Sequence, residues 1–423
     1  MLSNTSRQAI VAAVFSLGLA GATGAATAAE LVFWSMWNEP EPQAAALRQV
    51  MDAYTAAHPD TTFKVVWNGR QNQTKLRAAL QAGTPVDFMD QDADQLAGGL
   101  QKEGLGHDLS ADFDQATRDA FLPGTLELFN TEGKITQVPY VYNTVNFWYN
   151  KDMLAEVGGT VPATFDDLLA LCGTVKAAGK SALVIEGNVA FYNVLYFSHY
   201  LARESGAGAL VKVFEDKSGD GWKSPAVLAA AKATRGLWDQ GCIAEDARGF
   251  QYPAGQQTIA LGDTMGELVG SWLPTELTES AGADFPWGAF NFPAVKDGAG
   301  QSTDIEVGLL SMMVLKDSKN AQEAADFVKY VGSEEAQKIL VEASGVGVTR
   351  KGVAWPAALA DAYTSAEQAT ALSAFGGGLG VAYPEFTSTI LNPEYNNMFL
   401  GQTTPEQFVE TMAAKTKEYW AAQ

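Results

Sequence analysis

Apolar and polar residues follow two periods along this chain, one typical of short strands and one typical of amphipathic helices. The predicted strands are the mostly apolar runs 30–34, 62–67, 86–89 and 182–185. The predicted helices, in which apolar residues recur every three to four positions, are 43–58, 74–82, 166–178, 225–240, 321–332 and 405–420. Strands that alternate with helices predict an α/β fold with mainly parallel sheets.

Residues 1–29 have the pattern of a secretory signal peptide. Arg7 is their one charged residue, residues 9–20 are mostly apolar, and small residues end the segment at Ala29. The apolar part is too short and too rich in Ala and Gly to favour a membrane span, so a permanent anchor is the weaker alternative. We therefore expect cleavage near Ala29 and a periplasmic protein that does not insert into the membrane.

The chain is strongly acidic, with 28 Lys and Arg residues against 49 Asp and Glu residues and a formal net charge of −21. This balance argues against nucleic acid or anionic lipid as a partner, because phosphate binding needs a basic patch. Like charge also repels copies of the chain from one another, so we expect a monomer.

Histidine and cysteine are rare in the chain. His58, His107 and His199 are scattered and do not have the spacing of metal ligands, so we expect neither a metal nor a cofactor. Cys172 and Cys242 are the two cysteines. In an oxidising compartment they can form a disulfide, and two buried free thiols are an equally good interpretation of the sequence.

Five blocks of sequence carry a family resemblance, and they occur in the family's order. They are residues 31–34, 75–87, 138–168, 270–272 and 319–337. The third block is the most specific: it opens with Val138-Pro139-Tyr140 and continues through Tyr149-Asn150-Lys151-Asp152. Taken together, the blocks resemble the family 1 extracellular solute-binding proteins of carbohydrate ABC importers, the group that contains maltose-binding protein.

This resemblance implies the type II periplasmic binding protein fold. Two α/β lobes are joined by a hinge with three crossings, expected near Tyr142, Gly308 and Gly345, and the ligand lies in the cleft between the lobes. The N-terminal lobe is expected to contain residues 30–141 and 309–345. The C-terminal lobe is expected to contain residues 142–308 and 346–423.

The resemblance also implies a function without catalysis. The protein is expected to capture a mono-, di- or short oligosaccharide in the periplasm and to deliver it to an inner-membrane ABC permease. One alternative is a secreted glycoside hydrolase, since carboxylates such as Asp90 and Glu186 with aromatic residues in a cleft also suit hydrolysis. Another is a binding protein for a different polar solute, such as a polyol or a glycerol phosphoester. The sequence leaves the sugar itself, and service to a chemoreceptor, open.

A sugar presents hydroxyl groups, which carboxylates and amides bind, and flat C–H faces, which aromatic rings cover. The candidate contact residues, carried over by position, are Trp37, Glu39, Asp90, Gln91, Asp92, Asn143, Glu186, Tyr192, Trp272 and Tyr383. Trp272 is the strongest candidate, because it matches a stacking residue of the family and Gly270 allows a tight turn beside it. A solvated turn in which Trp37 caps the core is the alternative for the first two residues. Asn143 stands where maltose-binding protein has a carboxylate, so the hydrogen-bond pattern differs there.

Overall fold

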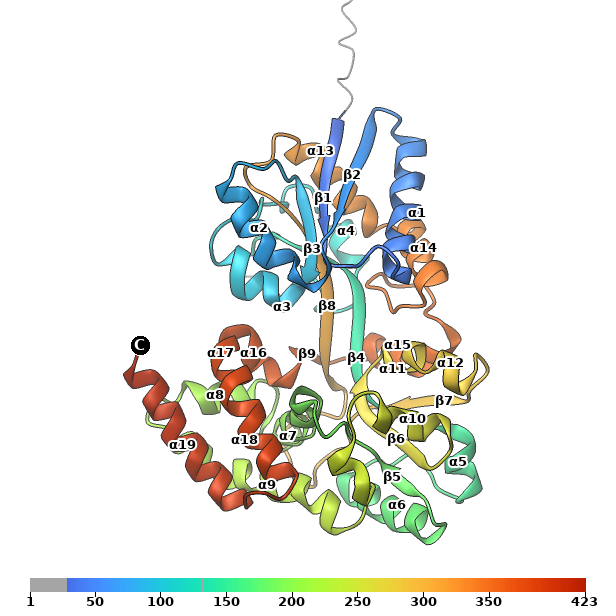
Figure 1. Ribbon diagram of the computed structural model, residues 1–423, viewed down its shortest axis with the longest axis vertical. Coiled ribbons are helices and arrows are strands. Elements are labelled where there is room, and N and C mark those ends of the chain that lie inside the picture. Colours follow the sequence, from blue (N-terminus) through green and yellow to red (C-terminus); the bar gives the residue numbers. More distant parts are fainter. Residues whose placement is uncertain (1–28, 131–132) are drawn as a thin grey trace, which may run out of the picture.

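The computed structural model describes residues 29–130 and 133–423, so nearly all of the predicted signal peptide lies outside the described residues. Two lobes lie one above the other, linked by the long strands β4 (Val138–Asn150) and β8 (Asp304–Val314) (Figure 1). The N-terminal lobe combines the first strands and helices with two helices from late in the chain, α13 (Ala321–Val331) and α14 (Glu334–Ser344). Each lobe is therefore built from segments that are far apart in the sequence.

One nine-stranded sheet runs through both lobes, in the order β2-β1-β3-β8-β4-β6-β5, with β7 paired to β4 and β9 paired to β8. The remaining strands are β1 (Ala29–Ser35), β2 (Thr61–Trp67), β3 (Phe88–Asp92), β5 (Ser181–Leu183), β6 (Thr264–Gly270), β7 (Trp287–Phe290) and β9 (Ala371–Ala374). The α/β architecture agrees with the sequence, but the expectation of mainly parallel pairing is wrong. Both crossing strands pair antiparallel with each other, and β4 also pairs antiparallel with β6 and β7.

The two crossing strands form the centre of the hinge. Asn143 of β4 pairs with Gly308 of β8, and the register of this ladder shifts by one residue between Pro139 and Val141, on the side of the N-terminal lobe. The upper half of β8 pairs with β3 and its lower half pairs with β9. The first two expected crossings, near Tyr142 and Gly308, are therefore neighbours in one ladder.

The third crossing follows α14. Gly345 has a left-handed φ of 68° and ends that helix. The backbone nevertheless stays with the N-terminal lobe for several more residues, because Leu122 donates to the carbonyl of Thr349 and Lys351 donates to that of Ala120. These bonds favour a lobe boundary after Lys351, later than the sequence places it. The division of the chain into lobes otherwise remains our prediction.

All six predicted helices lie within two residues of the observed ones. The matching helices are α1 (Pro42–Ala57), α2 (Asn72–Gln81), α6 (Phe165–Ala177), α9 (Pro225–Asp239), α13 and α19 (Pro405–Ala421). Capping boxes fix the start of two of these helices: Thr164 and Asp167 form one at α6, and Thr404 and Gln407 form one at α19. The sequence did not predict α7 (Ala190–Ser205), the buried central helix of the C-terminal lobe.

A disulfide joins Cys172 on α6 to Cys242, which follows α9. The sequence allowed either a disulfide or two free thiols, and the structure has the disulfide. Within the described ranges, no helix is both long and apolar enough to span a membrane.

Candidate functional site

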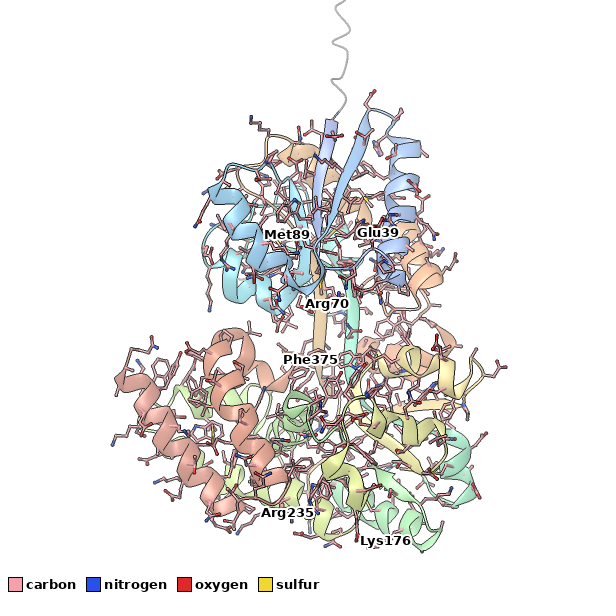
Figure 2. The ribbon with its side chains drawn as sticks, in the orientation of Figure 1. Glu39, Arg70, Met89, Lys176, Arg235 and Phe375 are labelled. Atoms are coloured by element: carbon pink, nitrogen blue, oxygen red, sulfur yellow. A yellow bond between two sulfur atoms is a disulfide. The ribbon has the colours of Figure 1, made fainter. Side chains whose placement is uncertain are left out.

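A cleft of about 590 Å³ separates the two lobes beside the crossing strands. Its N-terminal wall comes from the loops that follow β1, β2 and β3, and its C-terminal wall comes from α7, the segment after β6 and the segment after β9. Figure 2 places Arg70 on the edge of the N-terminal lobe and Phe375 on the facing edge of the C-terminal lobe. The cleft is where a type II binding protein is expected to hold its ligand.

Half of the predicted contact residues line this cleft. They are Trp37, Asp92, Asn143, Tyr192 and Trp272. These five come from five separate regions of the chain, and the hinge residue Asn143 lies between the two walls. The structure therefore brings together residues from both lobes and from the hinge, as the resemblance implies.

Glu39 is not among the cleft residues. Its side chain is 70% exposed and pairs with Arg48 at 2.6 Å, pointing away from the cleft (Figure 2). Glu41 lines the cleft instead. The reason is local: α1 begins at Pro42, and Glu41, as its N-cap residue, is turned inward toward Arg70.

Asp90 and Gln91 are buried behind the N-terminal wall, because β3 extends to Asp92 and not only to Met89 as expected. Asp90 accepts hydrogen bonds from the Met36 amide at 2.7 Å, from the Tyr140 hydroxyl at 2.8 Å and from the Ser35 hydroxyl at 3.2 Å. Burial raises the pKa of Asp90 to about 7, against the effect of these donors. Its carboxyl group braces the loop after β1 and does not face the cleft.

Glu186 and Tyr383 also lie away from the cleft surface. Glu186 is fully buried and accepts from the backbone N–H of Gln256 at 2.9 Å, and burial raises its pKa. Tyr383 packs on Phe214 with ring centroids 4.5 Å apart, and its hydroxyl donates to Glu215 at 3.3 Å. In this structure both are supporting residues of the C-terminal lobe.

Four aromatic side chains form the C-terminal wall, which we call the aromatic wall: Phe191, Tyr192, Trp272 and Phe375. Trp272 lies 5.8 Å from Tyr192 and 5.7 Å from Phe375 between ring centroids. A side chain at Gly270 would overlap the Trp272 ring, so this glycine is needed for the close approach of the ring to the backbone. Gly270 lies in β6 and not in the expected turn.

Phe375 is held by a contact that the sequence did not reveal. Glu306 of β8 is buried and accepts hydrogen bonds from the backbone N–H groups of Gly376 at 2.8 Å and Gly377 at 3.0 Å. The Phe375 ring lies against Gly308, where any larger residue would overlap it. A local signal existed, because an aromatic residue directly precedes three glycines.

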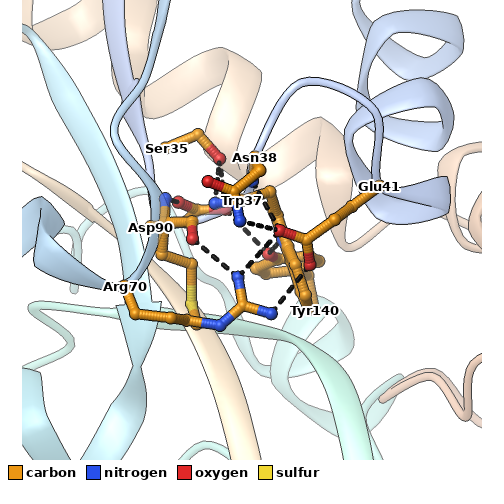
Figure 3. Close-up of polar contacts among 8 residues, drawn as sticks. Ser35, Trp37, Asn38, Glu41, Arg70, Asp90 and Tyr140 are labelled. Atoms are coloured by element: carbon orange, nitrogen blue, oxygen red, sulfur yellow. Dashed lines mark hydrogen bonds and ion pairs between the residues drawn. The ribbon is translucent and has the colours of Figure 1, made fainter.

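The N-terminal wall contains a second group of linked side chains (Figure 3). Trp37 is 7% exposed, and its Nε1–H donates to the Tyr140 hydroxyl at 2.9 Å. The guanidinium of Arg70 lies over the Trp37 ring, 4.6 Å from its centroid, and pairs with Glu41 at 2.7 Å. Trp37 therefore caps the core while it supports Arg70. The position of Arg70 just after a predicted strand was the signal that could have identified it.

Acidic groups dominate the charge of the cleft. Burial raises the pKa of Asp92, and burial together with the neighbouring Asp92 raises that of Asp94 to about 6. Among the described residues, no cluster of three or more His, Cys, Asp or Glu has a geometry that could hold a metal ion. The walls instead combine hydrogen-bonding groups with flat aromatic surfaces.

Comparison with known proteins agrees with this architecture. The lactose-binding protein of Rhizobium radiobacter is 24% identical over 366 residues, which cover 81% of this chain and 80% of the relative. The multiple sugar-binding protein of Streptococcus mutans is 25% identical over 228 residues, about half of each chain.

Solved structures share the fold at low sequence identity. The apo-form of RafE from Streptococcus pneumoniae superposes with a TM-score of 0.77 at 20% identity, covering 93% of this chain and 99% of RafE. The solute receptor AcbH also gives a TM-score of 0.77, at 18% identity, covering 93% of this chain and 98% of AcbH. The predicted binding-protein fold is thereby confirmed. Because the family model for bacterial extracellular solute-binding proteins matches residues 38–338, this chain belongs to that family.

Proposed function

We propose that the protein binds one sugar molecule in the interlobe cleft and delivers it to an ABC importer. The observation that carries the proposal is the pairing of two unlike surfaces across the cleft. The aromatic wall faces an N-terminal wall that holds Arg70 and the carboxylates of Asp92 and Asp94. A sugar matches both surfaces, because its C–H face packs on aromatic rings and its hydroxyls bind charged and amide groups.

In this proposal Trp272 stacks on a sugar ring, with Tyr192 and Phe375 at its sides. Asn143 and the N-terminal wall bind hydroxyl groups, and closing of the lobes buries the ligand. Relatives whose names give lactose, multiple sugars and diacetylchitobiose as ligands support the sugar class. Those ligands differ from one another, so the class and not the individual sugar is proposed.

The hydrolase alternative is not favoured. A glycosidase needs two carboxyl groups that reach the scissile bond from within the cleft. Asp90 and Glu186, the acids considered for that role, are both fully buried outside the cleft lining. The family and the relatives are binding proteins, which also favours capture without turnover.

The family is extracellular, so the protein works in the periplasm or outside the cell. We further propose signal-peptide cleavage near Ala29, a monomeric mature protein, and an inner-membrane permease as its partner. Cleavage there would leave β1 almost complete, because this strand begins at Ala29.

Isothermal titration of the mature chain with a panel of mono-, di- and trisaccharides tests the proposal. We expect one binding site per monomer for at least one sugar, and no new reducing ends after long incubation. Two equivalent sites, product formation, or no heat with any sugar would each contradict it.

A further inference from the structure

The charges around the cleft are unevenly distributed. Among the described residues that line it, Arg70 is the single cation, whereas four carboxylates are present. These are Glu41, Asp92, Asp94 and Glu276. An acidic ligand would therefore depend on Arg70 alone for a favourable charge.

Arg70 is already engaged by a partner of opposite charge. Its Nη2 donates to Glu41 Oε2 at 2.7 Å, and its Nη1 donates to Glu41 Oε1 at 3.2 Å and to the Met36 carbonyl at 2.8 Å. This two-pronged contact is the arrangement by which arginine recognises a carboxylate. Glu41 thus occupies the place that the carboxylate of an acidic ligand would take (Figure 3).

Glu41 is itself firmly held and ionised. Asn38 donates to its Oε1 through the backbone N–H at 2.7 Å and through Nδ2 at 2.6 Å. Burial alone would raise the pKa of Glu41, but the hydrogen bonds from Arg70 and Asn38 outweigh it and lower the pKa. At neutral pH the carboxylate therefore cancels most of the guanidinium charge.

The pair still leaves donors for a neutral ligand. A guanidinium has five N–H groups, and the three bonds above leave Nε–H and one Nη2–H without a partner in the part of the chain that the structure describes. The Arg70 side chain is 53% exposed and lines the cleft. These N–H groups can donate to sugar hydroxyls.

We propose that the Arg70–Glu41 pair selects sugars without an acidic group: Arg70 binds hydroxyls, while Glu41 excludes uronic acids and sugar phosphates. This inference rests on the proposed function and narrows its ligand class to uncharged sugars. Asp92, which is close enough to Arg70 to feel its charge, adds like-charge repulsion against any anion placed there. A glycerol phosphoester is excluded for the same reason.

The test compares neutral sugars with their C6-carboxylates, namely galactose with galacturonate, glucose with glucuronate, and lactose with its C6′-carboxylate. The wild-type protein should bind one neutral member at least tenfold more tightly than its acid. Glu41→Gln keeps the shape and an acceptor oxygen but removes the charge. It should shift the ratio of the two affinities toward the acid by roughly tenfold or more, the scale of a hydrogen bond to a charged group.

Two further variants make the result specific. Glu41→Gln combined with Arg70→Met should lose the gain, because the guanidinium is then absent. Glu39→Gln changes an acid two residues away that points to solvent, and it should alter neither affinity. Thermal melting of each variant establishes that it is folded at the temperature of the titration.

The outcomes separate the two proposals. Equal binding of a neutral sugar and its acid by the wild-type protein, or a Glu41→Gln variant with an unchanged preference, overturns the inference and leaves sugar binding intact. A gain that persists without Arg70 also overturns it. Failure of every sugar, neutral or acidic, to bind the wild-type protein overturns the proposed function, and the inference with it.

Discussion

The position of the Trp272 ring depends on Gly270. The ring lies against Gly270 and is flanked by Tyr192 and Phe375. The ring is partly buried against the edge of the hydrophobic core and also lines the cleft. We expect its main contribution to be to ligand binding.

Trp272→Ala should weaken sugar binding on the order of 5- to 150-fold, if stacking on a sugar ring resembles the roughly 1–3 kcal/mol measured for stacking on nucleic acid bases. The melting temperature should change little. Trp420→Ala is a suitable control, because Trp420 packs on Phe214 and bonds its carbonyl far from the cleft. The control should lower the melting temperature and leave affinity unchanged; the reverse pattern would show that Trp272 is structural.

Asp90 gives a prediction about pH. Its pKa rises from 3.8 to about 7 on folding because the carboxyl group is buried. Between these values the folded protein holds a proton that the unfolded chain releases, so this group makes the free energy of unfolding fall as pH rises. The slope is at most about 1.4 kcal/mol per pH unit, and the effect ends above about pH 7.

Urea unfolding of the wild-type protein and Asp90→Asn at several pH values from 4.5 to 7.5 measures this slope. The difference in unfolding free energy, wild type minus variant, should fall across the range. Asp114 has the opposite shift, because hydrogen bonds from Thr117 lower its pKa, and it stays ionised over the whole range. Asp114→Asn should therefore give a flat difference. A flat difference for Asp90→Asn as well would contradict the assignment.

Single residues of the site were predictable where a strand end fixed their position. Asp92 and Tyr192 could be placed in this way, and Trp272 came from the family resemblance. Glu41 was missed in favour of Glu39, because the choice between neighbouring acids depends on the ion pair with Arg70, 29 residues later. Phe375 was missed because its place depends on Glu306 and Gly308, on a strand about 70 residues earlier.

At the scale of elements, the segment after β9 is held by one side chain of β8. Gly376, Gly377 and Gly378 all have left-handed φ values, between 61° and 81°, so the segment follows a path that other residues rarely adopt. Glu306 holds this segment in place by accepting two hydrogen bonds from its backbone N–H groups. Ser198, His199 and Arg203 of α7 face Glu306, and burial raises its pKa to about 7.

Glu306→Gln should loosen this segment, because an amide has one acceptor oxygen where the carboxylate has two. Hydrogen exchange at Gly376 and Gly377, measured above about pH 7 where Glu306 is ionised, should accelerate roughly tenfold or more, as expected for loss of a bond to a charged group. Glu385→Gln, an exposed acid a few residues later, should leave exchange unchanged. Unchanged exchange in Glu306→Gln would show that backbone packing alone holds Phe375.

The six predicted amphipathic helices lie close to their expected bounds, whereas elements buried on all sides were missed or misplaced. The helix α7 buries polar residues such as Asn193, His199 and Arg203 together with apolar ones, so it has no simple polar face for the sequence to reveal. The strand β3 was placed too early, since its last residues are buried acids and amides that the pattern assigned to a loop. The position of α7 and the end of β3 both depend on tertiary contacts, which the local sequence pattern does not contain.

At the scale of the molecule, the hinge is a ladder of two long strands. Because β4 and β8 pair with each other where they cross, both must bend together when the lobes approach. Closing of the lobes should therefore make the ligand-bound protein more compact than the free protein.

Small-angle scattering with and without a saturating sugar should give a smaller radius of gyration for the bound protein. Trp272→Ala at the same sugar concentration should keep more of the open population, because its affinity is lower. An unchanged radius at saturation of the wild-type protein would contradict closure about this hinge.

The interleaved sheet has a consequence for the order in which the protein is made. A chain that emerges N-terminus first, from a ribosome or through an export pore, presents β1 to β3 long before β8, which must pair with β3. The whole stretch from β4 to β7 emerges in between, and α13 and α14 come later still. The first lobe to appear thus cannot be completed until the chain has passed Lys351. Nascent chains that end before this residue should be incompletely folded and therefore accessible to chaperones and proteases.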